Sequence, residues 1–354
     1  MKMVIVHDWL LNLGGAERVL IALHKIFPDA PMYTLFYNKE FVAKYIPGAT
    51  VTASFCQKIP LIKKIYPFVS FLFPTVIESF DFSSFDIVLS SSAIFSKGVI
   101  LKPRTKHICY CYSPTRFLWD LNNSYSRRGL LANIYKHTLR IWDRSATMRV
   151  DKFIAISENI KNRISKYYRR ESTIIYPLVS ISAITSAKTQ FSNYYLVVSR
   201  LYKYKNIGAV ISAFNKLKYP LIIIGDGPDF RRLSRMAGEN VIMLGFVEDN
   251  VLSTYYANCR AFVMSQDEDF GLTPIEAMTF GKPVLALRRG GALEIISEGK
   301  SGEFFDNPIP EAIADGVRRL EINYSLYNRE YIINSTKQYD FDTFKKNILK
   351  EIIC

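Results

Sequence analysis

The sequence predicts an α/β protein with two domains, each built around a parallel β-sheet. Three observations support this fold class. The chain has 354 residues, which is more than one ordinary hydrophobic core encloses. Short apolar runs alternate with helical segments in two separate parts of the chain, as in parallel sheets with crossover helices. Between these parts, residues 178–193 are rich in Ser, Thr and Ala and weakly patterned, which indicates a linker.

Residues 260–296 show the alternation most clearly. Ala261–Met264 is an apolar run that predicts a buried strand, and a polar, Gly-containing turn follows it. Thr273 as N-cap and Pro274 at the first helical position predict a helix that ends at Gly281. A second strand and a second helix then follow, at 283–287 and from 292. This order is typical of a parallel α/β sheet.

The N-terminal part of the chain begins with the same pattern. Val4–Val6 predicts a strand, and Gly14 and Gly15 form a glycine turn before a helix that starts at Ala16. Later apolar runs predict further strands of the first domain, at 85–90, 106–112, 152–157 and 172–177. Strands of the second domain are expected at 194–199, 221–224 and 241–246, and the tail 341–353 has the apolar spacing of a helix.

The turn after strand 261–264 has the residues of an anion site. The backbone amides of 270–273 lie at a helix start, where free N–H groups and the helix dipole favour a phosphate. Glu268 precedes these amides and Glu276 follows them, so their carboxylates can bind hydroxyls on either side of the phosphate. A sugar nucleotide has such hydroxyls on its hexose and its ribose. The alternative is that Glu276 only caps the helix and Glu268 is a solvated loop carboxylate.

Two cations follow the first strand of the second domain. Arg200 and Lys205 come between that strand and a helix expected from Asn206. Cations at the carboxyl end of a strand, beside a helix N-terminus, can neutralise a departing diphosphate. The alternative is that both are ordinary exposed charges.

The sequence Glu268-Asp-Phe-Gly-Leu-Thr-Pro-Ile-Glu276 resembles the E-x7-E element of retaining GT-B glycosyltransferases, in the large family (family 4) that includes bacterial lipopolysaccharide mannosyltransferases. The flanking Gly281-Lys-Pro-Val and Gly290-Gly-Ala-Leu-Glu294 match as well. The resemblance implies that Glu268 faces the donor hexose and that Glu276 binds the ribose. It also implies that the diphosphate meets the amides of Phe270, Gly271, Leu272 and Thr273.

The same resemblance implies an architecture, the GT-B fold, in which two Rossmann-like domains face a cleft. An acceptor-binding domain is expected at 1–178 and a nucleotide-sugar-binding domain at 190–335. The C-terminal helix, within 336–354, is expected to cross back and pack on the first domain. Arg200 and Lys205 match the paired cations of the family, and Gly245 is expected near the nucleotide base.

Parts of the first domain resemble this family too. Gly14 and Gly15 resemble the glycine loop that closes over the donor diphosphate. The run Ser113-Pro-Thr-Arg-Phe-Leu-Trp-Asp120 resembles a tract of the mannosyltransferase subgroup, but Tyr112 stands where many relatives have a histidine near the reacting sugar. Tyrosine is ordinarily a poor base near neutral pH, which puts the catalytic role expected at Tyr112 in doubt.

Two residues are expected to bind the acceptor. Asp8 follows the first strand, where α/β sheets bind ligands, and Arg116 lies in the tract after Tyr112. The alternatives are that Asp8 caps its loop and that Arg116 forms an ion pair with Asp120.

The net charge of +14 is concentrated in the first half of the chain. Residues 1–180 contain 25 Lys and Arg against 12 Asp and Glu, whereas the remaining residues contain 21 against 20. Such a field attracts polyanions, and since no nucleic-acid-binding motif is present, an anionic membrane surface is favoured. In residues 58–74, lysines 58, 63 and 64 stand beside large apolar residues, which suits an interfacial segment: Ile65, Phe68, Phe71, Leu72 and Phe73. The alternative is a core helix with a solvated lysine edge.

The sequence also predicts a location, which is cytoplasmic and peripheral at the inner face of the cytoplasmic membrane. Residues 1–6 have no leader pattern, and the apolar stretch 65–77 is short for a membrane span and contains Pro67 and Pro74. Five cysteines are an odd count, and Cys109 and Cys111 are expected to be buried thiols on one strand face. No His/Cys spacing suggests a zinc site.

The predicted function is retaining hexosyl transfer. The Glu268-Asp-Phe variant, the start Gly14-Gly-Ala-Glu17 and the Ser113-Pro tract are most similar to GDP-mannose-dependent enzymes of O-antigen and other surface-polysaccharide assembly. GDP-mannose is therefore the expected donor and a lipid-linked saccharide the expected acceptor. No cofactor is expected and no metal, because the two cations stand in for one. The alternatives are a UDP- or dTDP-linked donor, a nucleotide-sugar 2-epimerase of the same architecture, and a non-catalytic polyanion-binding protein.

Overall fold

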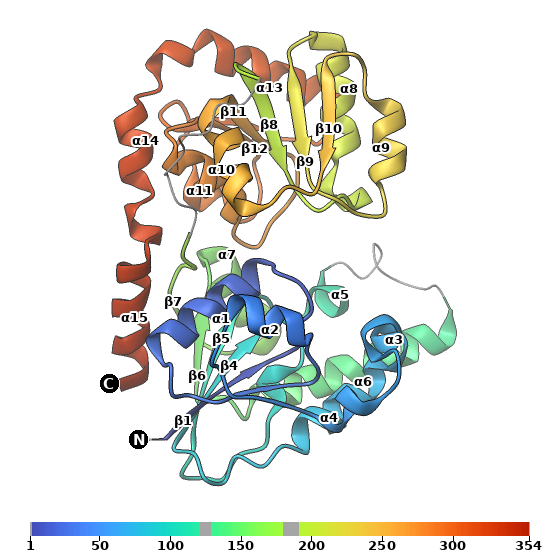
Figure 1. Cartoon of the computed structure of the whole chain (residues 1–354), viewed down its shortest axis with the longest axis vertical. Helices are drawn as coiled ribbons and strands as arrows, with labels where there is room; N and C mark the ends of the chain where they lie inside the picture. Colours follow the sequence, from blue (N-terminus) through green and yellow to red (C-terminus); the bar gives the residue numbers. More distant parts are fainter. Residues whose placement is uncertain (1, 121–128, 180–190, 354) are drawn as a thin grey trace. The chain divides into compact units, whose positions relative to one another are not determined.

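The structure is a computed structural model that describes residues 2–120, 129–179 and 191–353 (Figure 1). It divides into two compact units. Unit 1 is Met1–Pro177 together with Phe344–Cys354, and unit 2 is Leu178–Thr343. The linker expected at 178–193 falls largely outside the described residues.

Unit 1 contains a seven-stranded parallel sheet in the order β3-β2-β1-β4-β5-β6-β7. Its strands are β1 (Met3–His7), β2 (Met32–Thr34), β3 (Val51–Ala53), β4 (Ile87–Ser92), β5 (Lys106–Cys111), β6 (Lys152–Ala155) and β7 (Ser172–Ile174). The strand order changes direction between β1 and β4. Open α/β sheets bind their ligands beyond the carboxyl ends of the strands at such a point.

The helices of unit 1 supply the rest of its core. They are α1 (Gly15–Ile26), α2 (Lys39–Tyr45), α3 (Ile62–Val69), α4 (Phe73–Glu78), α5 (Arg116–Trp119), α6 (Leu130–Thr147) and α7 (Glu158–Arg163), with short helical turns η1 (Phe55–Lys58), η2 (Ser70–Leu72), η3 (Ser96–Gly98) and η4 (Ile164–Tyr168). Val6, Phe73 and Leu139 belong to one apolar cluster, which joins the sheet to α4 and α6. Helices α3, α4 and α6 lie together beside the sheet (Figure 1).

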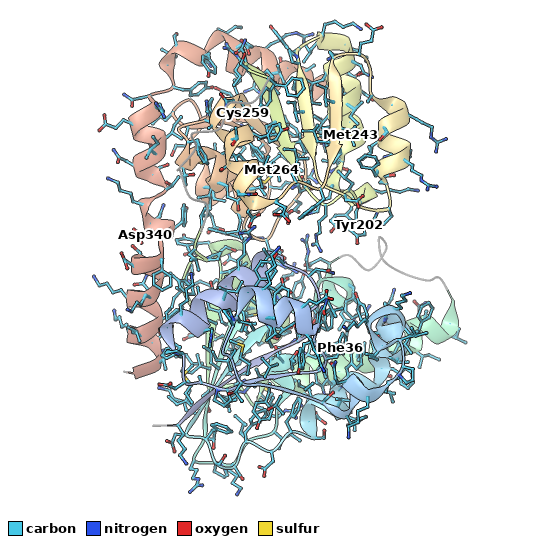
Figure 2. All side chains as sticks on the ribbon, viewed as in Figure 1. Phe36, Tyr202, Met243, Cys259, Met264 and Asp340 are labelled. Atoms are coloured by element: carbon cyan, nitrogen blue, oxygen red, sulfur yellow. The ribbon has the colours of Figure 1, made fainter. Side chains whose placement is uncertain are left out.

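Unit 2 contains a six-stranded parallel sheet in the order β10-β9-β8-β11-β12-β13. Its strands are β8 (Tyr194–Val198), β9 (Leu221–Ile224), β10 (Val241–Gly245), β11 (Cys259–Met264), β12 (Val284–Leu287) and β13 (Gly302–Phe305). The direction of strand order changes between β8 and β11. Met264 is buried in this unit, as Phe36 is in unit 1 (Figure 2). The predicted α/β class with two Rossmann-like domains is confirmed.

The helices of unit 2 are η5 (Lys203–Lys205), α8 (Ile207–Leu217), α9 (Phe230–Met236), α10 (Asp249–Asn258), α11 (Leu272–Thr279), α12 (Ala292–Ile295), α13 (Pro310–Ile322), η6 (Tyr324–Leu326), α14 (Arg329–Ser335) and η7 (Lys337–Tyr339). The N-cap predicted at Thr273 is wrong. The cap of α11 is Gly271, whose φ of 107° lies in the left-handed region that favours glycine, so the chain turns before Thr273. Pro274 falls in the first helical turn, where its missing N–H costs no hydrogen bond.

The helix predicted over 341–353 is confirmed as α15 (Phe341–Ile353). Its part from Phe344 onward belongs to unit 1, where the Phe344 ring lies 6.0 Å from that of Tyr110 and Glu351 pairs with Lys152. Residues 336–343 belong to unit 2, so the unit boundary lies within this helix. In the described part of the chain, no helix combines the length and apolar character that crossing a bilayer requires.

Candidate active site

The acidic turn of unit 2 lies between β11 and α11. Glu268 is half-buried on this turn, and Phe270 is buried against Tyr339 with ring centroids 5.5 Å apart. Gly271, Leu272 and Thr273 follow at the half-exposed start of α11, an eight-residue helix. The first N–H groups of a helix have no partner within it, so this turn presents backbone donors beside a carboxylate.

Lys205 and Glu268, which are far apart in sequence, form an ion pair. The Lys205 side chain is only 5% exposed, so the alternative of an ordinary surface charge does not describe it. Two hydrogen bonds join their loops, because Ser265 Oγ donates to the Lys205 carbonyl at 2.7 Å and Asn206 Nδ2 donates to the Ser265 carbonyl at 3.0 Å. The turns after β8 and β11 therefore form one site at the carboxyl edge of the sheet.

Gln266 is a site residue that the sequence analysis missed. Its buried side chain donates from Nε2 to Glu268 Oε1 at 3.2 Å, beside Lys205. The amide oxygen, Oε1, has no hydrogen-bond partner among the described residues. Reversing the amide would set that oxygen against a carboxylate, so Glu268 fixes its orientation. The available signal was its place two residues before Glu268.

Glu276 does not cap α11. It lies in the second turn of the helix, is buried, and accepts a hydrogen bond of 2.7 Å from the Tyr256 hydroxyl on α10. The alternative of a helix-capping glutamate is therefore excluded by its position. Tyr256 was also missed, because nothing in the local sequence pairs α10 with α11.

Arg200 and Gly245 lie on two turns of unit 2, after β8 and at the end of β10, on either side of the turn that follows β9. Arg200 is exposed after β8, with its guanidinium 6.0 Å from the Tyr202 ring. Gly245 ends β10 at a φ of 72°, and its carbonyl accepts from the Gly225 amide at 2.7 Å. A Cβ on Gly225 would lie 1.9 Å from the Ser199 carbonyl oxygen, so this glycine allows the backbone contact that supports the Arg200 turn.

Asp8 requires a correction. Its carboxylate is buried and accepts four backbone hydrogen bonds of 2.7–2.9 Å, from the amides of residues 93, 94, 95 and 96. These donors satisfy both oxygens, so Asp8 fixes the loop after β4, and the expected contact with an acceptor hydroxyl is wrong. From the sequence alone, a carboxylate that binds a distant loop cannot be told from one that binds a ligand. Here the partner segment lies 85 to 88 residues away along the chain.

Tyr112 requires a correction as well. Its hydroxyl donates to the Ala16 carbonyl at 2.9 Å and lies 2.8 Å from Ser91 Oγ. Burial raises the pKa of Tyr112 well above its ordinary value, so the residue does not act as a base near neutral pH. Its position is instead structural, because it joins the end of β5 to the start of α1.

His7 is the imidazole at this edge of the sheet, and the sequence analysis gave it no role. Its Nδ1 lies 3.0 Å from the Ser91 carbonyl, which can only accept, so Nδ1 carries a proton. Nε2 lies 3.7 Å from Glu17 Oε1. Glu17 also accepts from the Gly14 amide at 3.0 Å and so fixes the start of α1, where Gly14 is the N-cap and Gly15 the first residue.

Arg116 is the first residue of α5 and is half-buried. The Asp120 carboxylate, its alternative partner, forms an ion pair with Arg163 and accepts from the Tyr167 hydroxyl at 2.5 Å. Asp8, Gly14, Tyr112 and His7 therefore gather at the carboxyl edge of unit 1, with Arg116 on the tract that follows Tyr112.

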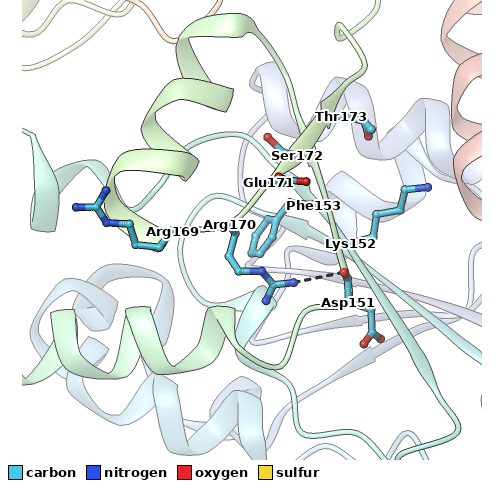
Figure 3. Close-up of a pocket in the computed structure, with 8 residues that line it drawn as sticks. All are labelled: Asp151, Lys152, Phe153, Arg169, Arg170, Glu171, Ser172 and Thr173. Carbon is cyan, nitrogen blue, oxygen red and sulfur yellow. Dashed lines mark hydrogen bonds between the residues drawn. The ribbon is translucent and has the colours of Figure 1, made fainter.

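A depression of about 530 Å³ lies elsewhere on unit 1 (Figure 3). It is lined by residues 151–153 and 169–173, at the amino ends of β6 and β7. Arg170 donates there to the Asp151 and Val150 carbonyls, so its guanidinium supports the chain. This depression contains none of the expected site residues and lies at the sheet edge opposite to them.

Comparison with known proteins gives a consistent result. Residues 184–338 match the family model described as glycosyl transferases group 1. An uncharacterized glycosyltransferase of Methanocaldococcus jannaschii is 26% identical over 56% of this chain and 58% of its own length. The alpha-1,3/1,6-mannosyltransferase ALG2 of Dictyostelium discoideum is 22% identical over 77% of this chain and 74% of its own.

Solved structures resemble the whole chain at low identity. The lipopolysaccharide outer core galactosyltransferase WaaB matches with a TM-score of 0.69 and 19% identity over 100% of this chain and 99% of its own. WaaG, a glycosyltransferase involved in lipopolysaccharide biosynthesis, matches with a TM-score of 0.71 and 13% identity over 99% of each chain. The chain thus has the GT-B fold of these glycosyltransferases, and its residues 184–338 match the family model of glycosyl transferases group 1.

Proposed function

We propose that the protein is a retaining glycosyltransferase that transfers a hexose, mannose from GDP-mannose, to a lipid-linked saccharide during surface-polysaccharide synthesis. The observation that carries this proposal is the ion pair of Lys205 and Glu268 beside the amides that open α11. One ammonium group has three N–H donors, so Lys205 is able to bond Glu268 and a diphosphate oxygen together. The choice of mannose over other hexoses is supported by the mannosyltransferases among the relatives.

The reaction follows from this chemistry. The bond between the donor's anomeric carbon and the diphosphate oxygen breaks, and the acceptor hydroxyl oxygen bonds to the same carbon from the same face. The hydroxyl proton passes to the leaving diphosphate, so no protein base is needed. Arg200, Lys205 and the amides of 271–273 stabilise the diphosphate charge, and Glu268 stabilises the positive charge that develops on the sugar. We assign the two cations the charge-neutralising role of a metal.

Nucleotide binding tests the donor site. We expect GDP to raise the melting temperature of the protein more than UDP or ADP, because the proposed donor is GDP-mannose. A ligand at one hundred times its Kd stabilises the folded state by about 2.7 kcal/mol. Lys205→Ala is expected to lose this response. Lys216→Ala is the matched control, since Lys216 pairs with Glu311 at 2.9 Å on the exposed surface of the same unit. A full response in Lys205→Ala, or no response of the wild type to any nucleotide, contradicts the proposal.

Product analysis then separates transfer from epimerisation. An epimerase changes the sugar of its nucleotide substrate without any acceptor. A transferase leaves the hexose unchanged and moves it only when a lipid-linked saccharide is present. A converted sugar nucleotide in the acceptor-free reaction would overturn the assignment.

We further propose that unit 1 binds the inner face of the cytoplasmic membrane, where the lipid-linked acceptor lies. Phe68 and Phe71 are 61% and 56% exposed at the end of α3 and in η2, next to the exposed Lys63 and Lys64. Helix α6 adds exposed Leu130, Ile134 and Ile141 with Arg144. The Ser70 and Tyr135 hydroxyls, 2.8 Å apart, join these two segments. Apolar side chains beside cations suit the interface of an anionic bilayer.

Vesicle sedimentation tests this surface. The double variant Phe68→Ser with Phe71→Ser is expected to bind phosphatidylglycerol-containing vesicles about 10²-fold or more weakly, because each ring that enters the bilayer interface contributes about 1.5–3 kcal/mol. Ile322→Ser is the control, since Ile322 is 78% exposed in unit 2. Equal binding to vesicles with and without anionic lipid, or equal losses in both variants, would argue against a specific membrane face.

A further inference from the structure

A buried ion pair lies beneath the tract that follows β5 in unit 1. Lys97 Nζ in η3 is 2.7 Å from Asp143 Oδ1 on the inner face of α6, and neither side chain is more than 1% exposed. Burial, the largest single influence, lowers the pKa of Lys97, but the Asp143 carboxylate together with Cys111 and Asp8 raises this pKa above its ordinary value. Lys97 is therefore charged, although its side chain is buried.

Asp143 also accepts three hydrogen bonds of 2.8 Å. Thr115 Oγ1 donates to Oδ1, while Trp119 Nε1 and the Tyr168 hydroxyl donate to Oδ2. Two of these donors stand at the two ends of the tract formed by residues 115–119. A single carboxylate thus bonds both ends of helix α5.

Helix α5 depends on these bonds for its conformation. It has only four residues, and helices shorter than about 12 residues are marginal without tertiary contacts. Thr115 is its N-cap residue, yet its side chain makes no capping bond and donates to Asp143 instead. Arg116 lies between the two bonded ends, so the direction of its side chain follows from the position of Asp143.

The buried ion pair of Lys97 and Asp143 is better explained by a role in orienting α5 than by a contribution to the stability of the fold. Replacing a buried ion pair by apolar residues of similar volume is often neutral or stabilising, so its presence is weak evidence of a stabilising role. On the opposite side of the same helix, α6 presents the exposed Ile134 and Ile141. Asp143 therefore connects the proposed membrane surface with the tract that carries Arg116.

We propose that Asp143, paired with Lys97, is a positioning residue that fixes the 115–119 tract in the geometry that binds the saccharide acceptor. This inference rests on the proposed transferase function. The four donors that converge on Asp143 set the orientation of α5, and α6 relates that orientation to the membrane face. Asp143 itself touches no substrate.

Acceptor kinetics of Asp143→Asn test the proposal. Asparagine retains one accepting oxygen, and its N–H₂ group then faces either Lys97 or Trp119, neither of which can accept a hydrogen bond, so the contacts that hold α5 cannot all remain. We expect kcat/KM for the acceptor to fall by about 10²-fold, as for a small misplacement of a binding group, while the affinity for nucleotide stays within about twofold. Glu78→Gln is the matched control, because Glu78 accepts from Trp142 Nε1 and Arg149, each at 2.8 Å, away from the tract.

A second readout keeps the result interpretable. Thr115→Val and Trp119→Phe each remove one bond to Asp143 and leave the ion pair, and smaller losses confined to the acceptor are expected in both. The indole N–H resonance of Trp119 should shift in Asp143→Asn and not in Glu78→Gln. A folded Asp143→Asn with normal acceptor kinetics, or with equal losses for donor and acceptor, overturns the proposal. A wild type without transferase activity overturns the proposed function alone. In that case the positioning role is overturned separately, if the Trp119 resonance does not shift in Asp143→Asn.

Discussion

Replacing Glu268 with alanine is expected to abolish hexosyl transfer while the fold stays intact. The isosteric Glu268→Gln is expected to reduce kcat by about 10²–10³-fold, the usual effect of removing one electrostatic contact to a developing charge. Glutamine cannot stabilise the positive charge that forms on the sugar as the bond to the diphosphate breaks. Rapid-quench measurement of hexose transfer at saturating donor and acceptor gives the comparison directly.

The ion pair leads to a second expectation for Glu268→Gln, in which nucleotide affinity does not fall with turnover. Glu268 and Lys205 neutralise each other in the structure, and Gln266 donates to the same carboxylate oxygen. Without the carboxylate, the Lys205 ammonium retains its charge and meets the diphosphate without competition. Nucleotide affinity in Glu268→Gln should therefore be equal to or higher than that of the wild type, as calorimetry with GDP would measure.

The control for this prediction is Glu311→Gln. It removes the carboxylate of another lysine–glutamate pair of unit 2, Lys216 with Glu311, which is exposed and far along the chain from the acidic turn. Its turnover should equal that of the wild type. Near-normal turnover in Glu268→Gln, or parallel losses of turnover and nucleotide affinity, would remove Glu268 from the catalytic role assigned here.

The parts of the site that the sequence predicted are those set by local chain order. The strand 261–264, the polar turn and the helix that follows form a contiguous pattern, and the structure has each of them as β11, the acidic turn and α11. The cations after β8 were predicted for the same reason. Parallel strands bring their carboxyl ends to one edge, so Lys205 and Glu268 were expected near each other before any contact was known.

The contacts that sequence could not predict are those between distant segments. Asp8 looks like a ligand-binding residue until the amides of 93–96 are seen to bond its carboxylate. Tyr256 and Glu276 lie on two helices with no shared sequence signal, and they meet only through side-chain packing in the folded unit. The N-cap at Thr273 failed for another reason, because the left-handed φ of Gly271 overrode an ordinary threonine cap signal.

Gly291→Ala is expected to abolish nucleotide binding although the substitution adds only one methyl group. A Cβ at this position would lie 2.1 Å from the Phe270 carbonyl oxygen and 2.4 Å from the Phe270 Cα. Both are backbone atoms of the acidic turn, so no side-chain rotation relieves the contact. The Gly291 amide also donates to the Glu268 carbonyl at 2.9 Å, which ties the turn after β12 to the turn after β11.

Displacing this backbone moves the whole donor site. The Phe270 peptide leads directly into the amides of 271–273, and a shift of about 1 Å at a binding site costs about 10²-fold in function. Overpacking of this kind also destabilises the fold by about 1–3 kcal/mol, so melting temperature and GDP affinity must be measured together. We expect GDP affinity to fall by far more than the loss of stability explains.

A glycine in open space provides the comparison for this loss. Gly299 has a φ of 72°, and within the described part of the chain no neighbouring atom lies within 4 Å of the place a Cβ would take. Gly299→Ala therefore adds backbone strain in unit 2 without touching the acidic turn, and it should lower the melting temperature and leave GDP affinity unchanged. If Gly291→Ala binds GDP as the wild type does, the second glycine turn does not support the acidic turn. The phosphate would then have to bind elsewhere. The hydrogen bonds of Ser265 and Asn206 connect the turn that carries Lys205 to the turn that carries Glu268 and the amides, so a displaced backbone would disturb all of these groups together.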